Sequence, residues 1–256
     1  MRVALLGATG AVGREILNTL EVRNFPASEI IPLASSRSKG SRVSFGGGEF
    51  EVSEVTADSF EGIDIAFFSA GGTASRLWAP EATRRGAVVI DNSSAWRMDP
   101  EVPLVVPEVN PGAITGNKGL IANPNCATIQ AVMVLKPLHD AAGLEQFSAV
   151  TFQSVSGTGK EAVTELARNS EAFLSGDKGI ASVYPHDIAF NVLPHIGGFD
   201  EGGISEEEWK MIRESRKILE LPGLDVRCTA ARVPVFRGHS EAVTALFKRT
   251  ISPKEA

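Results

Sequence analysis

The segment around Cys126 has the residue types of a covalent catalyst. Cys126 follows an Asn-Pro-Asn turn and precedes an apolar run, so we expect it to begin a helix. The thiolate is the reactive form of cysteine, and the positive end of a helix lowers the pKa of a thiol there. Position alone leaves two interpretations open, a nucleophile or a small buried apolar residue. For Cys228, inside an expected strand over 226–233, the second interpretation is favoured.

A cysteine nucleophile needs a base, and His239 is the best candidate among the four histidines. It follows Gly238 at an expected turn between two strands, with Arg232 and Arg237 close in the sequence. Arginine is the preferred clamp for carboxylate and phosphate because its planar fork donates hydrogen bonds in pairs. Arg97, in a loop, is another candidate clamp. The remaining histidines are expected to be packing or surface residues: His139, His186 and His195.

The first twenty residues predict a strand, a glycine turn and a helix. The apolar run Val3–Leu6 precedes the turn, and Arg14–Leu20 has a helical pattern. Glycines let the backbone approach a pyrophosphate, which the N–H groups of the following helix then hold. The GxxGxxG spacing is a variant of GxGxxG, and its place between a strand and a helix supports dinucleotide binding. The candidate cofactor residues here are Gly7, Ala8, Thr9, Gly10, Ala11, Val12 and Gly13.

The ends of the next strands refine the choice of cofactor. The expected strand 30–34 is followed by a serine-flanked arginine and by no acid that could hold a ribose 2′-hydroxyl, which favours NADP over NAD. Strands over 63–68 and 87–90, with a helix near 74–85 between them, also end in small polar residues, as the ligand edge of a parallel sheet does. These additional cofactor candidates are Ser35, Ser36, Arg37, Ser38, Ser69, Ala70, Gly71, Gly72 and Asn92.

The pattern along the chain predicts an α/β protein of two domains. Residues 1–125 are expected to form a Rossmann-type NADP-binding domain with a parallel sheet. Residues 126–256 are expected to form an α+β catalytic and dimerisation domain with a mostly antiparallel sheet. Its expected helices cover 127–142, 160–174 and 205–219, and its expected strands cover 147–152, 226–236 and 240–247.

Composition excludes several classes of protein. With 31 acidic and 25 basic side chains and a formal charge of −6, the chain lacks the basic patch that nucleic acid requires. No run approaches the roughly 20 apolar residues of a membrane span, and the N-terminus lacks a signal-peptide pattern, so we expect a cytoplasmic protein. Two distant cysteines indicate neither a disulfide framework nor a metal site. Short-chain reductases are excluded because the only tyrosine, Tyr184, is not followed by lysine four positions later.

Together, an NADP-type fold, a candidate thiolate, a histidine and arginines predict an aldehyde dehydrogenase that works through a thioester. The cysteine adds to the aldehyde, hydride leaves, and an acceptor cleaves the acyl-enzyme.

Eight motifs, in order, resemble those of the aspartate-β-semialdehyde dehydrogenase family, and the resemblance covers nearly all 256 residues. They are GATGAVG at 7–13, SSRS at 35–38, FFSAGG at 67–72, IDNSSAWRMDPEVPLVVPEVN at 90–110, NPNCATIQ at 123–130, SVSGTGK at 154–160, PHDIAFNVLPHI at 185–196 and RVPVFRGHSEA at 232–242.

The resemblance implies individual roles. Cys126 matches the nucleophile, His239 the general acid/base, and Gln153 the residue that orients the substrate. Arg232 matches the group that holds the α-carboxylate, and Glu207 the acid that receives the amino group, although its neighbours Glu206 and Glu208 leave the register open. Glu207 and Lys210 lie three positions apart, on one helix face. Further residues matched are Arg97 and Lys210 for phosphate, Asn125 for substrate, and Ser156 and Gly157 for the cofactor.

The activity that the resemblance implies is NADP- and phosphate-dependent interconversion of L-aspartate-β-semialdehyde and β-aspartyl phosphate, by a homodimer or a higher homo-oligomer. Two alternatives stay open. One is an N-acetyl-glutamyl-phosphate reductase, against which a free amino acid held by Glu207 and Arg232 would argue. The other is an inactive fragment that still binds nucleotide.

Members of this family continue for several tens of residues past the position that matches Ala256. We therefore expect a C-terminally shortened member, either a truncated gene product or a naturally short domain, whose exposed apolar surface favours instability or aggregation.

Overall fold

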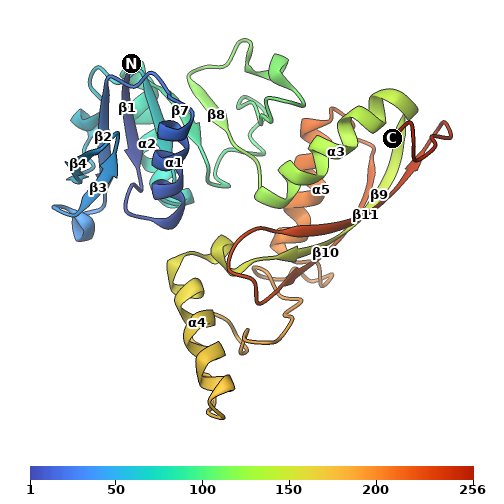
Figure 1. The fold of residues 1–256 in the computed structure, drawn as a ribbon. Helices are drawn as coiled ribbons and strands as arrows, with labels where there is room; N and C mark the ends of the chain where they lie inside the picture. The colour runs from blue at the N-terminus through green and yellow to red at the C-terminus, as the bar shows by residue number, and fades with distance from the viewer. The chain divides into compact units, whose positions relative to one another are not determined.

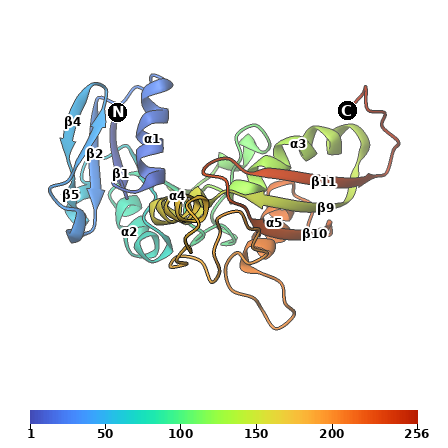
Figure 2. The same cartoon turned by 60° about the horizontal axis from the view of Figure 1, so that its bottom comes forward.

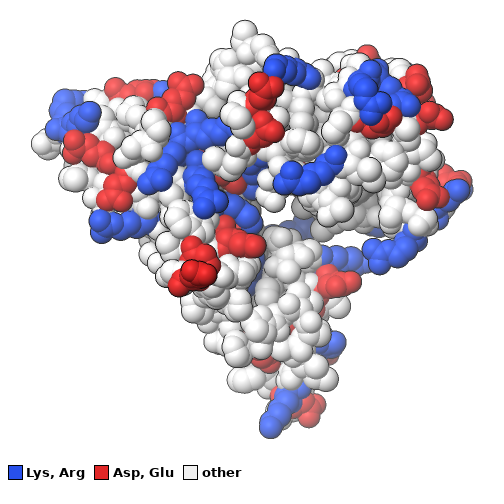
Figure 3. Space-filling view, turned by 180° about the vertical axis from the view of Figure 1, so that it is seen from behind, with Lys and Arg blue, Asp and Glu red and all other residues white.

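The computed structural model describes all 256 residues, in two units, Met1–Pro124 and Asn125–Ala256 (Figure 1). None of its helices combines the length and the apolar character that crossing a membrane requires. Positive and negative side chains are interspersed on the face that Figure 3 shows.

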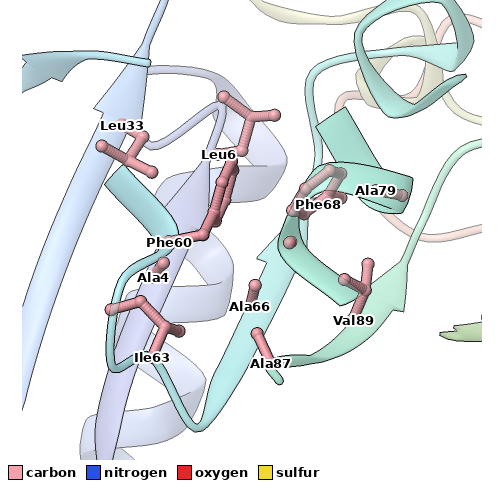
Figure 4. Close-up of a cluster of buried hydrophobic side chains, with 11 residues drawn as sticks. Ala4, Leu6, Leu33, Phe60, Ile63, Ala66, Phe68, Ala79, Ala87 and Val89 are labelled. Carbon is pink, nitrogen blue, oxygen red and sulfur yellow. The ribbon is translucent and has the colours of Figure 1, made fainter. Parts of the chain in front are cut away.

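A parallel sheet in the order β5-β2-β1-β6-β7-β8 forms the centre of the first unit. Both of its faces are buried, because alternate residues of one strand enter two different apolar clusters. In β1, Ala4 and Leu6 enter the cluster around Phe60 and Phe68 that Figure 4 shows, whereas Val3 enters the other. The strands are β1 (Arg2–Leu6), β2 (Glu29–Ala34), β5 (Ser53–Glu54), β6 (Ile65–Phe68), β7 (Val88–Asp91) and β8 (Leu120–Ala122).

The helices and the small hairpin of this unit complete its layers. The helices are α1 (Ala11–Val22) and α2 (Gly72–Arg84), with short 3-10 turns η1 (Ser36–Ser38), η2 (Ala57–Phe60) and η3 (Pro111–Ile114). The antiparallel hairpin is β3 (Arg42–Phe45) with β4 (Gly48–Glu51). Gly46 and Gly47 turn this hairpin with positive φ, as a two-residue hairpin loop requires.

The order of the strands places two glycine-containing loops together. The chain leaves β1 for β2 on one side, and β6 pairs on the other, so the direction of winding reverses at β1. At such a point the loops that follow neighbouring strands diverge and leave room for a ligand. Gly7, after β1, approaches Ser69, after β6, so closely that a Cβ on Gly7 would lie 2.4 Å from the Ser69 carbonyl oxygen.

A three-stranded sheet in the order β10-β9-β11 forms the second unit, with α3 (Cys126–Ala142) and α5 (Glu206–Ile218) packed against it (Figure 2). Along β9 (Leu144–Gln153), Phe147, Ala149, Thr151 and Gln153 are buried, whereas the alternate residues are more exposed. The other strands are β10 (Asp225–Arg232) and β11 (Ser240–Phe247). The turn η4 (Val155–Thr158) leads to α4 (Lys160–Leu174), which has its own apolar cluster with Ile188 and Leu193.

The expected α/β class and the parallel sheet of the first unit are confirmed, and two expectations need correction. The second sheet is mixed, since β10 lies parallel to β9 and β11 antiparallel. The crossover through α4 and α5 brings the chain back in the parallel direction. The strand expected over 226–236 ends at Arg232, because Pro234 has no N–H to continue the ladder. The short strands β3, β4, β5 and β8 were not expected.

Gly13 allows the first turn of α1 to approach the β1 loop, because a Cβ there would lie 2.2 Å from the Gly7 carbonyl oxygen. We expect Gly13→Ala to destabilise the protein by about 1–3 kcal/mol, since backbone must move. Gly72→Ala is the matched control, at another helix start where the nearest atom would lie 3.9 Å away. Urea unfolding followed by tryptophan fluorescence measures both variants, and equal midpoints would contradict the close approach.

Candidate active site

Cys126 occupies the first position of α3, and Asn125 holds that helix start in place. The Asn125 side-chain oxygen accepts the N–H groups of Ala127 and Thr128, at 3.0 and 3.3 Å. This is the capping geometry that asparagine favours, with the cap residue in extended backbone. The sulfur is therefore carried by a rigid turn and not by a loose loop.

His239 lies beside the thiol. Its Nε2 is 3.1 Å from the Cys126 sulfur, although 113 residues separate the two in sequence. On the other side of the ring, Nδ1 accepts the backbone N–H of Ser154 at 3.0 Å and lies 3.2 Å from the Ser154 hydroxyl oxygen. The predicted cysteine–histidine pair is thus a hydrogen-bonded pair in the structure.

The thiol is less acidic than its place at a helix start led us to expect. Cys126 is exposed as a residue, but desolvation of its thiolate by the surrounding protein raises the pKa of the thiol. The negative charge of Glu207 raises it further, and the helix-start N–H groups and Arg232 only partly oppose these effects. Burial, aided by Arg232, lowers the pKa of His239. The resting pair is therefore a neutral thiol and a neutral imidazole at neutral pH.

Glu207 is a buried carboxylate that joins several elements of the site. One oxygen accepts the side-chain N–H groups of Asn125 at 2.7 Å and Gln153 at 3.1 Å, and the other accepts Lys210 at 2.9 Å. Burial favours the neutral acid, but Lys210 and these hydrogen bonds prevail and keep the pKa of Glu207 below its usual value. Glu207 is therefore a carboxylate in the folded protein.

The neighbouring glutamates have other surroundings. Glu206 is exposed, and its side chain lies against Gly197. Glu208 accepts the Ser205 N–H at 2.7 Å, as part of a capping box, and the Ala230 N–H at 3.1 Å. Of the three, Glu207 is the one that faces Asn125 and Gln153.

Arg232, the last residue of β10, is a buried cation at the same site. One terminal nitrogen donates to the Ser154 carbonyl oxygen at 2.7 Å, whereas its Nε–H has no hydrogen-bond partner. Gly157 lies against it, because a Cβ on that glycine would lie 3.2 Å from Arg232 and 3.7 Å from His239. A buried N–H without a partner is costly, so this arginine is suited to an anionic ligand.

Most of the remaining predicted residues lie in the first unit. The Ser35–Ser38 segment adjoins the glycine turn, where the Thr9 hydroxyl donates to Ser38 at 3.4 Å, and Arg37 is exposed. Arg97 is buried and donates to the Asn92 carbonyl oxygen at 3.1 Å. Arg97 and its expected phosphate partner Lys210 belong to different units. Ser156 and Gly157, expected to contact the cofactor, lie in the second unit beside the Cys126 site.

Sequence reasoning missed two residues that shape the site. The buried Glu214 of α5 accepts the backbone N–H of Asn125 at 2.6 Å. Ser154 contacts His239 through both its backbone and its hydroxyl group. Glu214 had no signal beyond its place on the apolar face of a helix, whereas Ser154 at least stands in the motif SVSGTGK.

Comparison with known proteins gives consistent results. Residues 2–117 match the model of the semialdehyde dehydrogenase NAD-binding domain, and residues 135–256 match that of the semialdehyde dehydrogenase dimerisation domain. The aspartate-semialdehyde dehydrogenase of Aquifex aeolicus is 51% identical over 259 residues, covering 100% of this chain and 76% of the relative.

Solved structures agree in fold. A crystal structure of aspartate semialdehyde dehydrogenase II from Vibrio cholerae, complexed with ASA, matches with a TM-score of 0.95 and 46% identity, over 98% of this chain and 75% of that one. The enzyme of Candida albicans, solved with NADP, matches with a TM-score of 0.72 and 25% identity, over 98% and 73% of the two chains.

The raised pKa of the Cys126 thiol predicts its rate of alkylation by iodoacetamide. Because only the thiolate reacts, the rate should keep rising through about pH 9. Glu207→Gln removes a negative charge and should raise the rate at about pH 8 by at least about threefold. Glu206→Gln is the matched control, and Cys126→Ala reports any reaction of Cys228. A plateau at lower pH, or equal rates in the two glutamine variants, would contradict this electrostatic account.

Proposed function

The chain belongs to the aspartate-semialdehyde dehydrogenase family, and we propose that it interconverts L-aspartate-β-semialdehyde and β-aspartyl phosphate, using NADP and phosphate. This reaction serves the biosynthesis of lysine, threonine and methionine. The observation that carries the proposal is the Cys126 sulfur 3.1 Å from His239 Nε2 at the start of a capped helix, beside a carboxylate and an arginine.

In the proposed reaction, Cys126 is the nucleophile. Its thiolate attacks the aldehyde carbon, and His239 acts as the general acid/base that handles the proton, which gives a thiohemiacetal. Gln153 and Asn125 orient the substrate and the acyl-enzyme. Once the adduct has lost hydride to the bound cofactor, Cys126 carries a thioester, and phosphate attacks this thioester, releasing β-aspartyl phosphate and the Cys126 thiolate.

The charges of the site suit the two ends of an amino acid. We assign the substrate carboxylate to Arg232, whose Nε–H lacks a partner, and the substrate ammonium to the carboxylate of Glu207. Because opposite charges would hold both ends of the substrate at fixed positions, binding would also align the reacting carbon. Arg97 and Lys210 are proposed to hold the phosphate; Lys210 would exchange its bond to Glu207 for one to phosphate.

The first unit suits a dinucleotide. Gly10 caps α1 without a side chain, no acidic residue lies in the first turn, and the first N–H groups are left to hold an anion. Glycine-turn residues 7–13, with Ser69, Ala70, Gly71, Gly72 and Asn92, would line NADP, with Ser156 and Gly157 contributed by the second unit. Ser35, Ser36, Arg37 and Ser38 would hold its 2′-phosphate. When bound, NADP accepts the hydride in the oxidative direction.

The proposed organisation follows from these roles. Residues 1–125 form the cofactor domain, and residues 126–256 form the catalytic and dimerisation domain of a cytoplasmic homo-oligomer. The net charge of −6 and the mixed surface charges support small-molecule substrates over nucleic acid or membrane partners.

Activity should be visible as phosphate-dependent formation of NADPH from aspartate semialdehyde. Cys126→Ala should lower kcat by at least about 10³-fold, because the nucleophile is lost. Cys228→Ala is the matched control and should retain activity, since that thiol lies on β10 and its pKa is raised to about 12. Turnover without phosphate, or equal rates in the two variants, would exclude the proposed mechanism.

Cofactor preference can be tested at Arg37. Arg37→Ala should raise KM for NADP by about tenfold and change KM for NAD little, because only NADP carries the 2′-phosphate. Lys39→Ala is the control, a nearby cation whose Nζ lies 3.9 Å from Glu54. Equal changes for both cofactors would remove Arg37 from 2′-phosphate recognition.

A further inference from the structure

All the polar groups of Asn125, the cap residue of α3, are bound. Its carbonyl oxygen accepts the N–H of Ile129 at 3.0 Å, in the first turn of the helix, and its side-chain oxygen caps the same turn. Its other two groups are donors, and both bind carboxyl groups of α5. The side-chain N–H donates to Glu207 at 2.7 Å, and the backbone N–H donates to Glu214 at 2.6 Å.

The two glutamates lie on one face of α5. They are seven residues apart in the sequence, which is close to two turns of an α-helix. Both are buried, with 6% of Glu207 and 2% of Glu214 exposed, and Asn125 is 7% exposed. The distance to Glu214 is short for an N–H···O bond, as is typical where the acceptor is ionised. Helix α5 thus holds the start of α3 at two points, on the Asn125 side chain and on its main chain.

The contact with Glu214 satisfies a donor that α3 itself cannot. The N–H groups at the start of an α-helix have no partner inside the helix, and a buried N–H without a partner is costly. Because Asn125 and Cys126 are adjacent in the chain, fixing the backbone of Asn125 also fixes where the main chain of Cys126 begins.

The two contacts differ in how substrate would affect them. In the proposed function, on which this inference rests, Glu207 receives the ammonium group of the substrate. One Glu207 oxygen already accepts both Asn125 and Gln153, so a further donor there would compete with these bonds. The proposed reaction gives Glu214 no contact with substrate. The contact with the main chain is therefore the one that persists when substrate binds.

We propose that Glu214 is a positioning residue, which accepts the Asn125 N–H and so keeps Cys126 aligned while Glu207 exchanges partners. It acts through Asn125 and not on the substrate. A displacement of about 1 Å can cost about 100-fold in rate. Loss of this contact should therefore lower kcat, whereas KM should change little because Glu207 and Arg232, which hold the substrate, remain.

The hydrogen bond can be observed directly in the substrate-free protein. Pro124 and Asn125 form the only Pro-Asn pair in the sequence. Protein labelled with ¹³C-carbonyl proline and ¹⁵N-asparagine therefore gives a single signal in a spectrum that correlates each amide with the preceding carbonyl carbon. We expect this amide proton to lie downfield of the usual amide range and to exchange slowly with solvent. Fast exchange in the unmodified protein would overturn the proposal without any activity assay.

Two substitutions of Glu214 test the effect of this hydrogen bond on the reaction. Glu214→Ala removes the acceptor; it should move the Asn125 amide proton upfield and lower kcat by about 10- to 100-fold, with KM for the semialdehyde within about twofold. Glu214→Gln keeps an oxygen that can accept the same N–H and should restore kcat to within about threefold of the unmodified protein. An unchanged kcat in Glu214→Ala, or a kcat of Glu214→Gln reduced more than about tenfold, would contradict the proposal. The second result and the exchange measurement decide the matter even if Glu214→Ala does not fold.

Glu208→Ala is the matched control. Glu208 is also a carboxyl group of α5 that accepts backbone N–H groups, those of Ser205 and Ala230. Both alanine variants should be less stable in urea unfolding, but Glu208→Ala should keep kcat within about threefold. An equal fall of kcat in both would show that Glu214 acts only through general stability. Failure of the proposed function would appear as absent phosphate-dependent turnover in the unmodified protein, whereas failure of this inference would leave that turnover intact.

Discussion

The buried carboxylate of Glu207 is the interaction on which the Cys126 site depends. A charge in this position is tolerated only where donors surround it, and three side chains from separate elements donate to it. Asn125 is the most consequential of these. Because its amide N–H is bound to Glu207, its oxygen is directed to the first N–H groups of α3. The position of Cys126 thus follows from a residue 81 positions later in the sequence.

The same carboxylate also helps to keep the Cys126 thiol protonated in the substrate-free protein. Its negative charge adds to burial in raising the pKa of the thiol, against the helix start and Arg232. Since the pKa of His239 is lowered, neither member of the pair is charged at neutral pH. Geometry and charge therefore act in opposite directions here, because the group that places the sulfur also keeps it protonated.

Much of the fold could be predicted from the sequence because its signals are local. The glycine turn, the apolar run of β1 and the helix α4 each depend on residue types within a short window. Strands β5 and β8, of two and three residues, are too short to show a period. The adjacent glycines Gly46 and Gly47 are a local signal for the hairpin turn between β3 and β4. The parallel pairing of β10 depends on a crossover that no local pattern reports.

The residues of the site also divide into those that local sequence patterns predict and those that depend on the tertiary fold. Cys126, His239, Arg232 and Glu207 stand in motifs and could be named, and the structure brings these four together. The roles of Glu214 and Ser154 could not, since both act through contacts with backbone N–H groups that exist only once α5, β9 and β11 have packed. The direction in which the pKa of the Cys126 thiol shifts could not be predicted either. A helix start lowers the pKa of a thiol, but burial and the carboxylate of Glu207, which is distant in the sequence, outweigh that local effect.

A resting thiol is consistent with the proposed reaction. An uncharged thiol resists oxidation and stray alkylation, because only the thiolate is a good nucleophile. If Glu207 receives the ammonium group of the substrate, its negative charge is neutralised where it most affects the sulfur. Of the groups that raise the thiol's pKa, only Glu207 can be countered by a bound cation. The substrate would then favour the thiolate that attacks it, and reactivity would arise where an aldehyde is already aligned.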